Sequence, residues 1–174
     1  MEFFELISQR HSIRVYWEKP IPEGHLIKIL SAANKAPSAG NLQAYQIYWT
    51  SSKKKKAALA NAAYGQSFIA EASLVLCFCI NKRRSSIRYH NRGENLYSIQ
   101  DATIATTYAM LAAESLGLSS CWVGAFNDQA VQDVLEVTDK KNIIPVAILP
   151  IGYAREKPHP SPRRSLEDLV SEIN

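Results

Sequence analysis

The sequence is short of the features that mark secreted or membrane-spanning chains. Its 174 residues include three cysteines, Cys77, Cys79 and Cys121. An odd number without framework spacing argues against a secreted fold stapled by disulfides. No apolar run approaches the roughly 18–20 residues that cross a bilayer, and residues 1–9 are too short and too acidic for a secretion signal. We therefore expect a cytoplasmic protein without membrane association.

Metal ligands are scarce as well. Cys77 and Cys79 lie in a continuous apolar run, residues 74–80, and alternation along a strand puts both thiols on one face. A zinc site would need a second Cys or His pair at ligand spacing, and the sequence has none. Free cysteine packs as a small apolar residue, so core packing is favoured over a metal pair.

Charge of neither sign dominates. Lys and Arg total 20 against 16 Asp and Glu, giving a net charge of +4 and a pI near 9.0. This mild excess suits an anionic ligand and permits weak attraction to nucleic acid. The run Lys53–Lys56 precedes an alanine-rich helix pattern, which favours a solvated helix start over a nucleic-acid patch. No RNA- or DNA-binding signature is present, so we expect no nucleic-acid partner. A basic nucleic-acid-binding module is kept as the alternative of another class.

What is present indicates one globular domain over residues 1–174. Hydrophobic residues make up 47% and charged residues 21% of the chain, as in ordinary folded domains. Apolar residues recur at helical spacing in five segments: 3–9, about 23–35, 53–63, 101–116 and a helix from Asp128. Four runs of β-forming residues predict strands: 45–50, 73–80, 120–126 and 143–153.

Several details refine this expectation. Pro145 and Pro150 should lie at the ends of the last strand or on a sheet edge. Gly117-Leu118 fits a glycine cap at the end of the 101–116 helix. Alanines keep that helix slim, so it should be centrally buried or pack closely against a partner chain. Residues 81–95 have no clear period and indicate a long surface excursion that contains at most a helical turn.

The stretch Arg10-His11-Ser12-Ile13-Arg14 is the strongest candidate for binding a ligand. On an extended segment, residues 10, 12 and 14 share one face, which carries guanidinium, hydroxyl and guanidinium. Guanidinium forks are planar and always charged, so this set suits a phosphate or a polar ring edge. Taken alone, the stretch also fits a solvated basic turn.

Three further stretches could complete a site. Residues 36–43 (Ala-Pro-Ser-Ala-Gly-Asn-Leu-Gln) form a loop in which small residues would let backbone approach a ligand, or a plain helix-to-strand connection. Residues 120–126 open into a small-residue turn at Gly124 and Ala125. A second arginine pair, Arg163-Arg164, follows a proline-rich tail and precedes a capping box at Ser165, which predicts a short terminal helix.

In this order, these stretches resemble the nitroreductase family of flavin-dependent oxidoreductases. The resemblance covers nearly the whole chain. It implies an α+β fold with a mainly antiparallel central sheet flanked by helices. It also implies a domain-swapped homodimer, with the long central helix at the interface and the C-terminal extension reaching to the partner. Two FMN molecules would lie between the subunits, each held by both chains.

The resemblance also assigns roles to residues. On the phosphate side, Arg10 would bind the FMN phosphate with support from neighbouring side chains, and Arg14 would reach the pyrimidine edge of the ring. The full phosphate-side set is Arg10, His11, Ser12, Arg14, Arg163 and Arg164.

The remaining cofactor contacts would lie around the ribityl chain and ring. Pro37, Ser38 and Asn41 would come from the other subunit. Gly124 and Ala125 would present backbone near N5 and O4 of the flavin. No side chain is assigned a catalytic role, since the chemistry of this family resides in the cofactor.

By resemblance, NADH or NADPH would pass hydride to flavin N5, and a small electrophile such as a nitroaromatic or a quinone would then accept it. An alternative keeps the flavin and the fold but changes the reaction, for example to reductive dehalogenation, flavin remodelling or oxidation of a heterocycle.

Overall fold

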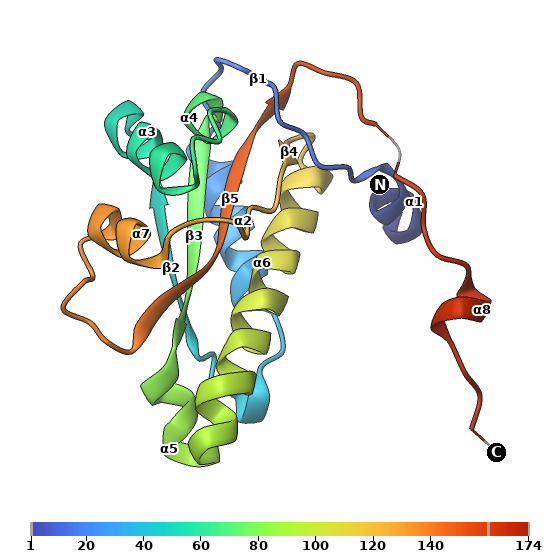
Figure 1. Ribbon diagram of the computed structural model, residues 1–174. Coiled ribbons are helices and arrows are strands. Elements are labelled where there is room, and N and C mark those ends of the chain that lie inside the picture. The colour runs from blue at the N-terminus through green and yellow to red at the C-terminus, as the bar shows by residue number, and fades with distance from the viewer. Residues whose placement is uncertain (1, 160, 174) are drawn as a thin grey trace.

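The computed structural model describes residues 2–159 and 161–173, and in this part of the chain a central antiparallel sheet is enclosed by helices (Figure 1). The strands are β1 (Tyr16–Trp17), β2 (Tyr45–Thr50), β3 (Leu74–Asn81), β4 (Ser119–Ser120) and β5 (Ile143–Ala154). Their order is β1-β5-β3-β2, with β4 paired to β5, and every pairing is antiparallel. The predicted α+β fold is confirmed.

Helices cover both faces of the sheet, with α3, α4 and α7 on one side and α2 and α6 on the other (Figure 1). The helical elements are α1 (Phe3–Gln9), α2 (Glu23–Asn34), the 3-10 turn η1 (Ala39–Asn41), α3 (Lys53–Ala62), α4 (Phe68–Glu71), α5 (Lys82–Arg92), the π-helical turn η2 (Gly93–Tyr97), α6 (Ser98–Ser115), α7 (Asp128–Leu135) and α8 (Leu166–Leu169). The short α4 was not predicted.

Strand β3 is apolar throughout because both of its faces are buried. Val75 and Cys77 pack toward α3 and α7, whereas Leu76 and Phe78 pack toward α2 and α6. Cys79 is fully buried as well, and burial raises the pKa of its thiol to about 12. Both strand cysteines are therefore core residues, as their sequence context favoured.

The predicted position at a strand end is confirmed for Pro145, but the prediction is wrong for Pro150, which lies inside β5, an interior strand of the sheet. Pro145 lies near the start of β5 at a shift in its register with β3, where a missing N–H is tolerated. Pro150 is interior, opposite Val75, and its carbonyl accepts from the N–H of Cys121 at 3.4 Å. Proline has no backbone N–H to donate to a neighbouring strand. Regular pairing between β5 and β4 ends at Ser120, so no hydrogen bond on that side of β5 requires an N–H from residue 150.

Residues 81–95 are helical over nearly their whole length, which corrects the prediction of a surface excursion with at most a helical turn. They form α5 and enter η2, with a break at His90 (φ 47°, ψ −134°). Close packing compensates for the absent apolar period: a Cβ on Gly93 would lie 2.5 Å from the carbonyl oxygen of Ser85. The following helix α6 accordingly begins at Ser98 rather than at Asp101.

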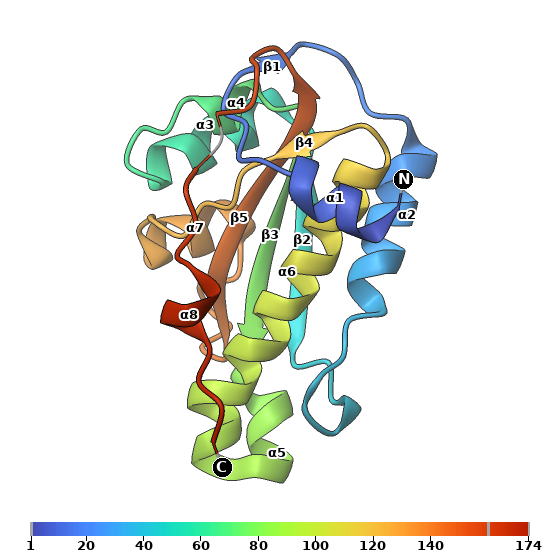
Figure 2. The same cartoon turned by 90° about the vertical axis from the view of Figure 1, so that its right-hand side faces the viewer.

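Helix α6 ends as predicted. Gly117 has φ +73°, its N–H donates to Glu114 O at 2.9 Å, and the N–H of Leu118 donates to Ala113 O at 3.0 Å. This pair of bonds is the Schellman cap. Only one face of the helix is buried, through alanines such as Ala109 against the sheet. Its outward face includes Tyr108 at 39% exposure. In Figure 2, α1 lies in front of one end of the helix, and the middle of the helix faces the viewer.

Three smaller predictions are resolved in the same way. The predicted 120–126 strand shrinks to β4 plus one bridge between Val123 and Ile148. Lys56 is not solvated: it is 6% exposed and its Nζ donates to the carbonyl of Ala72. The predicted terminal helix is α8, where Ser165 Oγ accepts from the N–H of Asp168 at 3.2 Å.

Candidate functional site

The Arg10–Arg14 stretch is extended, and its one buried residue, Ile13, fixes it to the rest of the fold. The N–H of Ile13 donates to Ser120 O at 3.1 Å, and Tyr16 Oη donates to Ile13 O at 2.6 Å. Ile13 is 3% exposed, whereas Ser12 and Arg14 on the opposite face are exposed. Alternation therefore directs the guanidinium and hydroxyl groups outward, as the sequence predicted.

The C-terminal tail returns to this stretch and completes a hollow of about 370 Å³. The hollow is lined by Arg10, His11, Ser12, Arg14, Glu156, His159, Ser161 and Arg163. Of the predicted phosphate-side residues, only Arg164 lies outside the lining; its Nη2 donates to the carbonyl of Asp168 in α8. We call this hollow the arginine hollow.

The arginine hollow has an uncompensated positive charge. In residues 2–159 and 161–173, none of the guanidinium groups of Arg10, Arg14 and Arg163 forms an ion pair. The lining holds one carboxylate, Glu156, and it accepts backbone N–H groups of Arg14 at 2.5 Å and Val15 at 3.2 Å. Free donors around one space fit a strongly charged anion.

Sequence reasoning missed the contribution of Glu156, His159 and Ser161. Their only signal was proximity to Arg163 in the proline-rich tail. Glu156 fixes the hollow in place, because it binds the backbone of the Arg10–Arg14 stretch while the N–H of Arg155 donates to Val15 O at 2.9 Å.

A second hollow, of about 520 Å³, lies where α6 begins. It is lined by Pro37, Ser38, Ala39, Tyr97, Gln100, Asp101, Thr103 and Ile104. We call it the loop hollow. Asp101, which is 2% exposed, holds its loop through both carboxylate oxygens, which accept from the N–H of Ala39 at 2.9 Å and of Ala44 at 3.2 Å. Ser38 Oγ accepts from the N–H of Gln43 at 2.9 Å.

Asn41, predicted to bind the cofactor, lies outside the lining of the loop hollow. Asn41 adopts a positive φ of 56° and its Oδ1 accepts from the side-chain amide of Gln43 at 3.0 Å, so its side chain stays within the loop. The structural role of Asp101 was missed by sequence reasoning, which read it only as a residue suited to a helix start.

The two hollows lie at opposite ends of α6. Asp101 stands near the start of the helix at the loop hollow. Glu114 stands near its end, where burial raises the pKa of its carboxyl and the charges of Arg10 and His11 lower it. Thirteen residues at about 1.5 Å per residue separate Asp101 from Glu114 by about 20 Å along the axis. Within one chain, most of the length of α6 therefore separates the two hollows.

Gly124 and Ala125 lie outside both linings. They are exposed and belong to the segment that crosses β5 between β4 and α7 (Figure 1). The carbonyl of Ala125 accepts from Gln66 Nε2 at 3.0 Å, which fixes the segment against α4.

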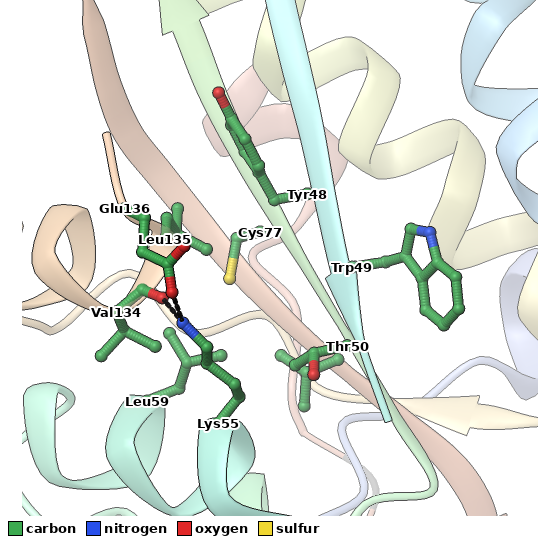
Figure 3. A pocket seen from close by; sticks show the side chains of 10 residues that line it. Tyr48, Trp49, Thr50, Lys55, Leu59, Cys77, Val134, Leu135 and Glu136 are labelled. Atoms are coloured by element: carbon green, nitrogen blue, oxygen red, sulfur yellow. Dashed lines mark hydrogen bonds and ion pairs between the residues drawn. The ribbon is translucent and has the colours of Figure 1, made fainter. Parts of the chain in front are cut away.

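A third hollow, of about 220 Å³, opens between β2, β3, α3 and α7 (Figure 3). Its charged groups neutralise each other: Lys55 Nζ lies 2.6 Å from Glu136 Oε1 and 2.7 Å from Val134 O. Cys77 directs its sulfur toward this space. The paired charges distinguish it from the arginine hollow.

Across 2–159 and 161–173, no three His, Cys, Asp or Glu side chains gather as they would around a metal ion. None of the helices described there combines the length and the apolarity that a membrane crossing requires.

Fold and site together define a protein of the nitroreductase class. A family model described as Nitroreductase family matches residues 7–79 and 62–153, and this chain belongs to that family. It is 30% identical to FMN reductase [NAD(P)H] of Bacillus subtilis, over 93% of this chain and 70% of that relative. It is 31% identical to NADH dehydrogenase of Thermus thermophilus, over 93% of this chain and 91% of the relative.

Solved structures agree with this placement. Bacillus megaterium NfrA2 superposes with a TM-score of 0.90 at 27% identity, covering 98% of this chain and 74% of that one. NADPH:FMN oxidoreductase from Vibrio harveyi, complexed with NAD⁺, gives a TM-score of 0.87 at 26% identity, covering 98% and 76%.

Proposed function

We propose that this chain is an FMN-dependent NAD(P)H oxidoreductase that passes hydride to small electrophiles of the nitroaromatic or quinone type. The names of its relatives, FMN reductase and NADPH:FMN oxidoreductase among them, support the cofactor and the donor. The single observation that carries the proposal is the arginine hollow, which gathers unpaired guanidinium groups from both ends of the chain.

The donor set of the arginine hollow fits FMN. A phosphate dianion needs several charge-assisted donors, which Arg10 and Arg163 supply, with Ser12 and His11 beside them. Arg14 lies on the same face and would bind the polar edge of the flavin ring. Bound FMN supplies a hydride-carrying nitrogen, N5, so the protein's own residues bind and orient rather than react. Arg164 is not part of this set, because it contacts α8.

The chain forms a homodimer in this proposal. The loop hollow and the arginine hollow are too far apart to share one cofactor within a chain. If α6 packs antiparallel against α6 of a second copy, the loop hollow of each copy meets the arginine hollow of the other. Pro37, Ser38 and Asn41 then complete the partner's site. The outward face of α6, where Tyr108 is 39% exposed, is the surface available for this packing.

Gly124 and Ala125 are proposed to present backbone groups to the ring. Their exposed segment leaves β4, which also fixes the Arg10–Arg14 stretch through Ser120. A cytoplasmic location is retained in the proposal, because the three cysteines are free and a reducing compartment suits them.

The first test is the absorption spectrum of the purified protein. We expect flavin bands, and FMN as the compound released by heat. Arg10→Ala and Arg163→Ala should each lower FMN retention about tenfold or more, since a charge-assisted bond to phosphate is lost. Arg164→Ala is the matched control and should retain FMN. Equal retention by all three variants would contradict the phosphate assignment.

Activity provides the second measurement. The flavin-loaded protein should oxidise NADH or NADPH when a nitroaromatic or quinone acceptor is present. Bound FMN without any such turnover would instead favour a diverged flavin reaction on the same fold.

A further inference from the structure

Helix α5 carries a concentration of positive charge that FMN binding does not use. Lys82, Arg83, Arg84, Arg88 and Arg92 all lie in its 11 residues. Lys82 lies 3.4 Å from Glu94, but across residues 2–159 and 161–173 the four arginines form no ion pair. Like charges one turn apart destabilise a helix. An anion bound to these arginines would offset the free-energy cost of their mutual repulsion.

Arg84 and Arg88 contact the 39–42 loop, and Arg92 follows them beyond the break at His90. We call Arg84, Arg88 and Arg92 the arginine row. Arg84 Nε donates to the carbonyl of Leu42. Arg88 approaches the loop so closely that a Cβ on Gly40 would lie 2.8 Å from its Nη1.

Arg92 connects the row to the loop hollow. Its Nε donates to Tyr97 Oη at 2.9 Å, and its guanidinium carbon lies 5.3 Å from the centre of the Tyr97 ring. Tyr97 lines the loop hollow together with Ser38. The arginine row therefore runs from that hollow outward along the protein surface.

The row is held in place yet remains available to a ligand. Gly40 (φ +55°) admits Arg88 and Tyr89 against the loop, and the Tyr89 ring meets Tyr97 edge-on at 5.0 Å. All three guanidinium side chains are exposed. Each guanidinium has five N–H donors, and these contacts use one at most, so the others are free for an anion.

We propose that the arginine row binds the phosphate groups of the pyridine dinucleotide that reduces the flavin. The proposal rests on the function proposed above and names the part of the protein that recognises the donor. The loop hollow faces the cofactor in the dimer, so a nicotinamide ring that enters there leaves its phosphates over the 39–42 loop. Guanidinium forks match phosphate geometry, whereas a neutral nitroaromatic or quinone gains little from three arginines.

Kinetics of the flavin-loaded enzyme test the row. The variants are Arg88→Gln and the triple variant R84Q/R88Q/R92Q. We expect the triple variant to raise KM for the dinucleotide about tenfold or more, with kcat at saturating donor, KM for the acceptor and FMN content unchanged. Arg83→Gln removes the same charge from the same helix away from the row, and its KM should stay at the parent value.

Comparing KM for NADPH with KM for NADH identifies which phosphate group of the dinucleotide the row binds. A rise in KM for NADPH alone assigns the row to the 2′-phosphate, and a rise for both NADPH and NADH assigns it to the pyrophosphate. Unchanged KM for both, or an equal rise in the Arg83→Gln control, overturns the proposal.

Binding measured by calorimetry separates this proposal from the proposed function, since it needs no turnover. Adenosine 2′,5′-bisphosphate probes the 2′-phosphate and ADP probes the pyrophosphate. At least one should bind the parent protein and bind the triple variant about tenfold or more weakly. If neither probe binds the parent, or if both proteins bind each probe equally, the row is not a phosphate site. A parent that holds no FMN contradicts the proposed function independently of these titrations.

Discussion

Asp101 is a buried carboxylate whose two oxygens fasten both ends of the 39–44 loop to α6. Replacement by alanine leaves the N–H groups of Ala39 and Ala44 without acceptors. Since Ala44 is fully buried, we expect Asp101→Ala to lower the free energy of unfolding by about 2–4 kcal/mol. Urea denaturation measures this loss. Asp139→Ala removes an exposed carboxylate and should stay within about 0.5 kcal/mol of the parent; equal losses in the two variants would contradict the role of Asp101.

Single residues also show what can be predicted from the sequence and what cannot. Arg10, Ser12, Arg14 and Arg163 were chosen for their chemistry, and the structure brings them to one hollow. Whether they bind FMN stays a prediction. Lys56 was misjudged, because a run of lysines indicates exposure but cannot show that one of them turns inward to a carbonyl at the end of α4.

At the scale of elements, replacing two glycines by alanine distinguishes the effect of backbone conformation on stability from the effect of packing. A methyl group would meet nothing within 4 Å at either Gly117 or Gly24, but Gly117 has φ +73° and Gly24 lies in the ordinary first turn of α2. Gly117→Ala should therefore lower the free energy of unfolding by about 1–2 kcal/mol. Gly24→Ala should raise it by about 0.4–1 kcal/mol. Thermal or urea unfolding decides, and a loss of the same size in both variants would contradict the conformational argument.

The elements that sequence predicted well are those with local signals. The alanine-rich pattern and the Gly117 cap located α6, and the continuous apolar run located β3. Helix α5 was missed because its stability comes from contacts with distant residues: Arg84 with Leu42, and Gly93 with the Ser85 backbone. The interior position of Pro150 was missed because it depends on where pairing with β4 stops, which only the folded sheet reveals.

At the scale of the whole molecule, exposed apolar side chains occur on α6, on α1 and in the C-terminal tail. Helix α1 exposes Phe4 at 79%, the tail exposes Ile173 at 95%, and α6 exposes Tyr108. Burying such groups between two chains would supply the main driving force for association.

Tyr108→Asp tests the dimer. A carboxylate in the middle of the α6 face would be desolvated on packing, so we expect the variant to be monomeric and to lose FMN at the same time. Light scattering after size-exclusion chromatography gives the mass, and absorbance gives the flavin content. The control is Tyr64→Asp, which makes the same change at a tyrosine that is 71% exposed beyond α3. A monomeric Tyr108→Asp protein that still holds FMN would refute the shared site.

The distance between the ends of α6 also has a consequence for how the enzyme responds to its surroundings. A cofactor that must touch two chains binds only the assembled pair, so assembly and loading are linked by mass action. If the chain assembles as proposed, with two identical sites per pair, raising free FMN would tighten association. Dilution of the protein would then release flavin even though the affinity of each formed site is unchanged. The supply of flavin would then set how much of the enzyme exists as active pairs.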